Sequence, residues 1–225
     1  MKNMVMICAV CIFLSLTAPA KAGTITQDFD TIGASLGEGG HLIDQLSGLT
    51  FTGAYIAKEG SNPQIYAYWA GTGYGTDGAY SGSYSITDLR GDGPTGFGNP
   101  SYPVSVSFST PIDDLSFYAM DIDGSNDKRE ILTASVYDNF LNLLQTITVI
   151  SGDSGTGDGT AKLVEFTAGN ISSLEIEVKL MNGHQEGAWA LDDLSYTPVP
   201  VPGAIWLLGS GLIGLAAFGG RRGKS

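Results

Sequence analysis

Polar and apolar residues alternate along several short stretches in the middle of the 225-residue chain. In residues 104–108 every second side chain is apolar, and residues 174–180 place four apolar side chains on one face and three charged ones on the other. A period of two is the pattern of an antiparallel strand with one buried and one solvated face. Both stretches are therefore predicted to be half-buried strands.

Similar segments recur along the chain, separated by clusters of Gly, Asn, Asp, Ser and Pro, which favour turns. The other predicted strands are residues 24–29, 49–56, 64–69, 115–120, 130–137, 143–150, 161–167 and 189–196. Between them we find no amphipathic helix, apart from one short turn over His41–Leu46. Many short strands favour a β-sandwich or barrel, and we expect an all-β, antiparallel jelly-roll β-sandwich.

Two stretches do not alternate. Residues 71–100 are rich in Gly, Tyr, Ser and Asp, and residues 151–160 form a polar sequence typical of a loop. A motif of Asp-Asp-Leu-Ser followed by an aromatic residue occurs at Asp113–Phe117 and again at Asp192–Tyr196. We interpret this single recurrence as the chemistry of strand entry rather than as a duplication.

The N-terminal residues have the pattern of an export signal. Lys2 precedes a short apolar run, and Ala20-Lys21-Ala22 then supplies a small-residue cleavage site. This order predicts a secretory signal peptide, residues 1–22, cut before Gly23, with Ala18-Pro19-Ala20 as the alternative site. The competing interpretation is a membrane anchor, for which the apolar run is short.

The C-terminal residues, 198–225, carry three features in a fixed order. A proline-rich spacer leads into an apolar stretch of about residues 203–220, which is long enough for a membrane helix at ~1.5 Å per residue. A basic tail, residues 221–225, follows with Arg221 and Arg222. By the positive-inside rule this tail stays in the cytoplasm, the domain lies outside, and Trp206 sits at the outer interface of the inner membrane.

This order resembles the PEP-CTERM sorting signal of Gram-negative bacteria, with Pro200 and Pro202 as its two prolines. Val201 stands between them, as in the Val-Pro-x-Pro variant, and Gly203 stands where that variant usually has Ala. The resemblance implies recognition by an exosortase, cleavage near Pro202 and release to the cell surface or the extracellular matrix, often together with exopolysaccharide. The alternative is a one-pass anchor that is never cut.

Charge distinguishes the exported domain, residues 23–197, from both ends of the chain. The whole chain has 11 Lys and Arg against 23 Asp and Glu, and the domain keeps all 23 acids with only six bases, a formal charge of −17. Binding a phosphate backbone needs clustered Lys and Arg, so nucleic acid is excluded as a partner. Cys8 and Cys11 lie in the signal peptide, which excludes disulfides and thiolate metal sites from the exported chain.

The last predicted strand, Trp189–Tyr196, resembles the closing strand of many exported jelly-roll domains, carbohydrate-binding modules among them. In such domains this strand lies beside the first strand, and a structural calcium ion bridges the two. The resemblance therefore implies a Ca²⁺ site made by Asp28 or Asp30 together with Asp192.

A second candidate for calcium follows from the residues themselves. Asp121, Asp123 and Asp127 surround a tight glycine turn, and Ca²⁺ takes six to eight oxygen ligands from such loops. Leu132 stands where an EF-hand has its bidentate Glu, so the loop is not an EF-hand. The competing interpretation is an acidic turn in an acidic protein.

Six aromatic residues lie close together in sequence among Gly, Ser and Asp. They are Tyr66, Tyr68, Trp69, Tyr74, Tyr80 and Tyr84. Sugars stack their apolar C–H faces on such rings while polar neighbours bind the hydroxyls, so this cluster predicts a glycan-binding surface. The competing interpretation is that several of the rings, Trp69 above all, belong to the core, as does Trp189.

Hydrolase motifs are incomplete. Gly33–Gly37 matches the letters of a nucleophile elbow without its strand-to-helix context, and the only histidines, His41 and His184, belong to no metal motif. We therefore predict an exported, non-enzymatic surface or matrix protein that binds exopolysaccharide. Two alternatives stay open: a secreted glycan-active hydrolase, and a purely structural matrix or adhesion protein.

Overall fold

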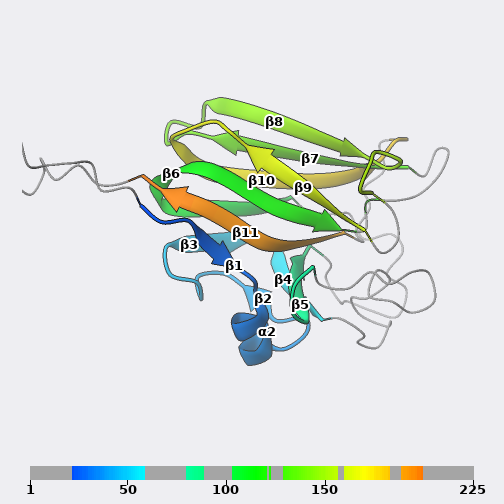
Figure 1. The fold of residues 1–225 in the computed structure, drawn as a ribbon. Coiled ribbons are helices and arrows are strands. Elements are labelled where there is room, and N and C mark those ends of the chain that lie inside the picture. The colour runs from blue at the N-terminus through cyan, green and yellow to red at the C-terminus, as the bar shows by residue number, and fades with distance from the viewer. Residues whose placement is uncertain are drawn as a thin grey trace, which may run out of the picture. The chain divides into compact units, whose positions relative to one another are not determined.

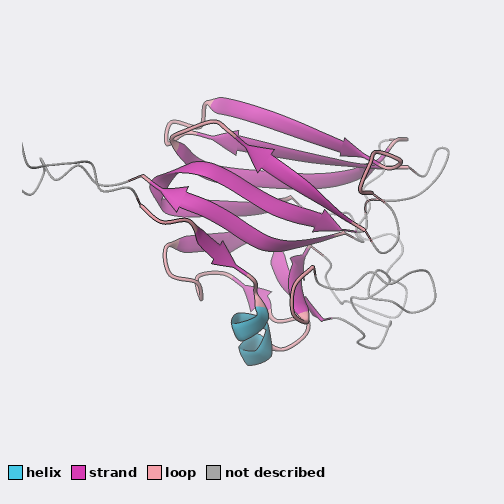
Figure 2. Cartoon of the chain, viewed as in Figure 1, coloured by secondary structure: helices cyan, strands magenta, loops and turns pink. Residues whose placement is uncertain are grey.

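The computed structural model describes residues 22–58, 80–88, 103–120, 122, 129–156, 160–182 and 189–199. Thr24–Pro198 form one compact unit. Its described residues are mostly strands, with a single short helix (Figures 1 and 2). Every pair of neighbouring strands in this part of the chain is antiparallel. The prediction of a predominantly β, antiparallel fold is thus confirmed.

Strands and the helix follow one another along the chain. In sequence order they are β1 (Ile25–Gln27), α2 (Asp30–Leu36), β2 (His41–Leu42), β3 (Leu49–Thr52), β4 (Ala54–Lys58), β5 (Tyr84–Thr87), β6 (Val104–Met120), β7 (Glu130–Tyr137), β8 (Leu143–Ile150), β9 (Ala161–Phe166), β10 (Ile171–Leu180) and β11 (Ala190–Pro198).

The long strand β6, with 17 residues, belongs to two layers. Its first half pairs with β3 and β10. In this layer β10 also pairs with β7, and β7 pairs with β8. Its second half pairs with β9 and β11. In this layer β11 also pairs with β1 and β5, β5 pairs with β4, and β4 pairs with β2. One continuous hydrogen-bonded sheet therefore supplies both layers, joined through β6 (Figure 1).

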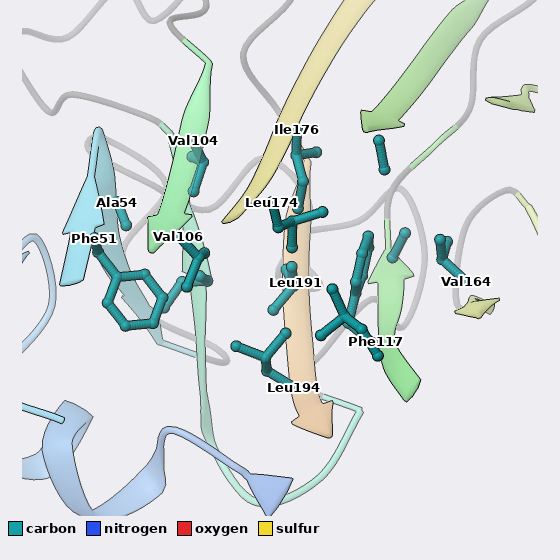
Figure 3. Close-up of a cluster of buried hydrophobic side chains, with 14 of the residues drawn as sticks. Phe51, Ala54, Val104, Val106, Phe117, Val164, Leu174, Ile176, Leu191 and Leu194 are labelled. Carbon is teal, nitrogen blue, oxygen red and sulfur yellow. The ribbon is translucent and has the colours of Figure 1, made fainter. Parts of the chain in front are cut away.

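The core lies between these two layers. Alternate residues of β7, Leu132, Ala134 and Val136, are buried, as the period of two predicts. Figure 3 shows buried side chains of both halves of β6 in one cluster with those of β3, β9, β10 and β11. Trp189 is fully buried, as predicted, whereas Trp69 lies outside the described residues.

The recurring Asp-Asp-Leu-Ser-aromatic motif marks a bulge inside each of two neighbouring strands. Asp114 in β6 and Asp193 in β11 have φ angles of 49° and 48°, and the β6–β11 register shifts at both places. Asp is among the few residues that adopt this left-handed conformation readily, and the extra residue re-aims the strand. Our interpretation as strand entry was wrong, because both motifs lie within strands.

Several expected boundaries also differ. Strands 104–108 and 115–120 join to form β6, whereas 49–56 divides at Gly53, whose φ of 76° separates β3 from β4. β5 forms within the stretch expected to be irregular, and residues 41–42 form β2 rather than a helical turn. The expected strand 64–69 lies outside the described residues.

The helix α2 was missed because its seven residues are too few for a periodic pattern. It packs against β4 and β5, and Gly33 on its buried side lies directly against the ring of Tyr84. A Cβ at residue 33 would collide with that ring, so glycine at this position permits the close approach. The contact is tertiary and leaves no local signal.

In the part of the chain that the structure describes, no helix has the length and apolar character needed to cross a membrane. The predicted spanning segment, about residues 203–220, lies outside that part, as do residues 1–21 of the predicted signal peptide.

Replacing Phe117 by Ala tests the shared core. The Phe117 side chain is fully buried, so its loss is expected to lower the free energy of unfolding by about 3–5 kcal/mol. Leu163 on the adjoining β9 is 39% exposed, and Leu163→Ala should cost less than about 1 kcal/mol. Urea unfolding followed by circular dichroism measures both values, and equal losses would contradict this assignment of the core.

Candidate functional site

The structure gives Tyr80 and Tyr84 different surroundings. Tyr84 is half-buried against the core, with Gly33 on its ring and the Lys58 amine 5.7 Å from its ring centroid. Tyr80 instead remains 49% exposed. The other four predicted sugar-stacking residues, Tyr66, Tyr68, Trp69 and Tyr74, lie outside the described residues.

The exposed ring of Tyr80 stacks on Tyr118 of β6. Their ring centroids are 3.5 Å apart and the ring planes differ by 14°. Tyr118 lies between Phe117 and Ala119, which are both buried in strand alternation, so its own side chain is on the outer face of the sheet. Two phenol rings thus form a flat, partly exposed surface on that face.

Apolar and acidic groups adjoin this tyrosine pair. Leu163 of β9 is the register partner of Tyr118, and the next residue on the same face of β9 is the exposed Glu165. Hydrogen bonding to Tyr80 raises the pKa of Tyr118, as do burial and the negative charges of Asp193 and Glu165. Tyr118 therefore stays neutral at pH 7, in an acidic environment.

Three carboxylates fix the segment that carries Tyr80. Asp192 Oδ2 accepts the backbone N–H of Ser81 at 2.8 Å, and Asp193 Oδ1 accepts the Ser81 hydroxyl at 2.7 Å. Asp30 Oδ1 accepts the N–H groups of Ser83 and Tyr84 at 2.8 and 3.1 Å. Because Ser81 is bonded through both its backbone and its side chain, the position of Tyr80 is set in advance of any ligand.

Asp192 is a buried carboxyl group at the base of this arrangement. Burial raises its pKa to about 7, and the charges of Asp193 and Asp30 raise it as well, against the lowering effect of the N–H groups of Ser81 and Asp193. Asp192 thus titrates near neutral pH.

The predicted calcium ligands are only partly described. Asp121, Asp123 and Asp127 lie outside the described residues. Asp28 is exposed and accepts the N–H of Asp30 at 3.1 Å in a local turn. The described ranges contain no group of three or more His, Cys, Asp or Glu side chains that could hold a metal ion.

Asp30 and Asp192 are the pair of predicted calcium ligands whose charges act on one another. Backbone N–H groups already occupy Oδ1 of Asp30, Oδ2 of Asp192 and, through Asp193, Oδ1 of Asp192. The described residues alone therefore do not complete a calcium site.

The predicted sorting residues Pro200, Pro202, Trp206, Arg221 and Arg222 lie outside the described residues. Sequence reasoning missed Tyr118, the partner of Tyr80. The sequence does indicate that Tyr118 is on the outer face of a strand, because the apolar residues Leu115, Phe117 and Ala119 alternate around it. The contact with Tyr80 joins residues 38 positions apart and could not be read from the pattern.

No family model matches this chain, and neither does any curated protein. Among solved structures it is similar to the K2 cleaved adhesin domain of Lys-gingipain, with 11% identity, coverage of 78% of this chain and 99% of that one, and a TM-score of 0.44.

Two further solved structures are similar to the chain. The CBM22-1 xylan-binding domain of Xyn10C from Paenibacillus barcinonensis has 14% identity, coverage of 82% of this chain and 99% of that one, and a TM-score of 0.40. A DUF4465 family protein from Bacteroides caccae has 14% identity, coverage of 80% and 95%, and a TM-score of 0.39. At these levels the comparisons assign neither a family nor a function to the chain.

Asp192 should make the domain less stable as pH rises from about 4 to about 7. Its pKa in the folded state, about 7, exceeds the ordinary 3.8, so the folded chain keeps a proton that the unfolded chain releases. This contribution to stability is complete below the unfolded pKa and is lost as pH rises through the folded pKa, at up to about 1.4 kcal/mol per pH unit.

Urea unfolding at about pH 5 and about pH 8 in chelator measures this effect. The free energy of unfolding should fall less between the two pH values in Asp192→Asn than in the unmodified chain. The exposed Asp28→Asn variant should behave like the unmodified chain. Parallel pH profiles for Asp192→Asn and the unmodified chain would contradict the assignment.

Proposed function

We propose that this chain is an exported, non-catalytic polysaccharide-binding protein of the cell surface or extracellular matrix. The observation that carries the proposal is the exposed Tyr80 ring, stacked on Tyr118 and held in place through Ser81. A flat aromatic surface suits the C–H face of a sugar ring, and the neighbouring carboxylates of Glu165 and Asp193 can accept hydrogen bonds from sugar hydroxyls.

The fold proposed for the binding domain, residues 23–197, is a jelly-roll sandwich. The antiparallel pairing, the two layers joined through β6 and the pairing of β1 with the closing strand β11 support it. Such a sandwich presents the Tyr80–Tyr118 pair on the outer face of the layer formed by β9, β6 and β11.

The route to the surface is also part of the proposal. The signal peptide over residues 1–22 directs export, and the segment 198–225 anchors the chain in the inner membrane until an exosortase-type enzyme cuts it. Support comes from the order of proline spacer, apolar stretch and basic tail.

Ca²⁺ is proposed as a structural cofactor and as a bridge to acidic polysaccharide. A domain with a formal charge of −17 repels polyanions, so acidic polymers should bind only when a cation lies between the carboxylates. The repulsion between the charges of Asp30 and Asp192, which a cation would relieve, supports a cation in the Tyr80 region.

Tyr80→Ala tests polysaccharide binding. Losing the stacked ring should weaken co-sedimentation of the purified chain with the host exopolysaccharide by about tenfold in the presence of calcium. Tyr137→Ala, on the outer face of the other layer, is the matched control and should bind normally.

Reducing ends are measured in the same samples and should not appear. Reducing ends released by the unmodified chain would instead favour a glycan-active hydrolase. If the chain shows neither binding nor turnover, the remaining alternative is a structural matrix protein.

Calcium should raise the melting temperature and chelator should lower it, because a ligand that binds only the folded chain stabilises it by mass action, about 2.7 kcal/mol at 100 times its Kd. Asp30→Asn should reduce the shift, whereas Asp44→Asn, an exposed acid in the loop after β2, should keep it. If calcium does not change the melting temperature, the proposal of a calcium ion is wrong.

A further inference from the structure

The turn between β7 and β8 exposes large apolar side chains. Phe140 and Leu141 at its tip are each 78% exposed, and Leu143 at the start of β8 is 58% exposed. Leu144 beside it is partly exposed as well. We call these four residues the apolar turn. Single exposed apolar side chains are ordinary, but four within five residues indicate a contact surface.

This turn has a rigid frame. Asp138 Oδ1 accepts the N–H groups of Phe140 and Asn142 at 2.8 and 2.9 Å, and Oδ2 accepts the Asn142 side-chain amide at 2.9 Å. Backbone hydrogen bonds also join Asp138 to Asn142 and Leu141. These hydrogen bonds lower the pKa of Asp138, so the frame is complete at neutral pH.

Leu141 occupies a position where a branched apolar residue is unfavourable. Its φ is 63°, in the left-handed region that Gly or Asn adopts at lower energy. Connecting two strands does not by itself require an apolar residue at this position. Both the conformational cost and the exposure of Leu141 are explained if its side chain contacts an apolar environment outside the domain.

The apolar turn lies at the end of the sandwich where the chain leaves towards its C-terminus. Pro198 pairs with Ile112, which pairs with Ile171, and Ser173 two residues later pairs with Tyr137, next to the turn. Figure 1 shows the β7–β8 turn and the C-terminal end of β11 at the same end of the domain.

The distance from this end to the C-terminal apolar stretch is short. Only residues 199–202 separate Pro198 from Gly203, and a fully extended chain of this length reaches no more than about 18 Å. While the C-terminal segment is embedded, this end of the domain therefore stays close to the bilayer surface. An exposed Phe and Leu on a rigid turn are suited to the interface between headgroups and acyl chains.

We infer that the apolar turn contacts the lipid bilayer and orients the domain on the membrane before its release. The inference rests on the proposed membrane anchorage. Asp113 and Asp114 lie at the same end of the sandwich, so anionic headgroups would repel it and zwitterionic lipid is the partner that fits. A few apolar side chains alone bind a bilayer weakly. The C-terminal anchor keeps the turn near the bilayer and so raises its effective concentration there.

The test uses the exported chain, residues 23–225, reconstituted in phosphatidylcholine vesicles. This chain contains no cysteine, so Phe140→Cys carries a single environment-sensitive apolar fluorophore. Ser154→Cys, exposed in the loop beyond the other end of β8, is the matched control. Vesicle flotation reports anchorage, and quenching by spin-labelled lipid reports contact of the label with the bilayer.

We expect the chain to float and the label at residue 140 to be quenched several-fold more strongly than the label at residue 154. Equal quenching in a chain that floats would overturn the inference and leave the anchorage intact. A chain that does not float would refute the anchorage, and the orienting contact with it.

A second label position keeps the test independent of the probe. With the fluorophore on Leu143→Cys, quenching should fall several-fold when Phe140→Ser and Leu141→Asn are added, because Asn keeps the left-handed turn. Flotation should not change. A fluorescence shift that needs no lipid and grows with protein concentration would assign the turn to a contact between two copies and overturn the membrane contact.

Discussion

The fold depends on one strand that belongs to both layers. β6 pairs with β3 and β10 along its first half and with β9 and β11 along its second. Asp114 interrupts the second half with a left-handed residue, and a matching residue, Asp193, interrupts β11 beside it. Without these bulges the alternation of each strand would continue unbroken, and Leu115 and Leu194 would not both face the core.

The same bulge positions the candidate site. Asp192 and Asp193 are consecutive, yet both side chains reach Ser81, because the left-handed conformation at Asp193 turns the chain between them. The residues that shape the strand therefore also place Tyr80 on Tyr118. Asp192 and Asp193 thus belong both to the bulged strand and to the candidate site, so that a change to either one would alter the strand and the position of Tyr80 together.

Alternation alone predicted most strands of the domain, and residues 130–137 and 143–150 to the residue, because each strand buries one face. It failed where a contact distant in sequence decides the conformation. α2 exists because Gly33 fits under Tyr84, and Tyr80 belongs to a site because Tyr118 lies beneath it. The charge of Asp30, which was named from a resemblance, does raise the pKa of Asp192, and both carboxylates bond residues 81–84, a segment that no pattern connected to them.

The pairing of β11 has a consequence for when the domain can form. β11, the last strand of the domain, is hydrogen-bonded to β1 near the start of the domain and to β5 and β6 nearer its middle. Such pairings between distant segments form late, since the loops between them must close first. On the proposed export route, a chain threaded from its N-terminus would complete neither layer around β6 until residue 198 had crossed. On that route the domain would fold only after its last strand had crossed the membrane.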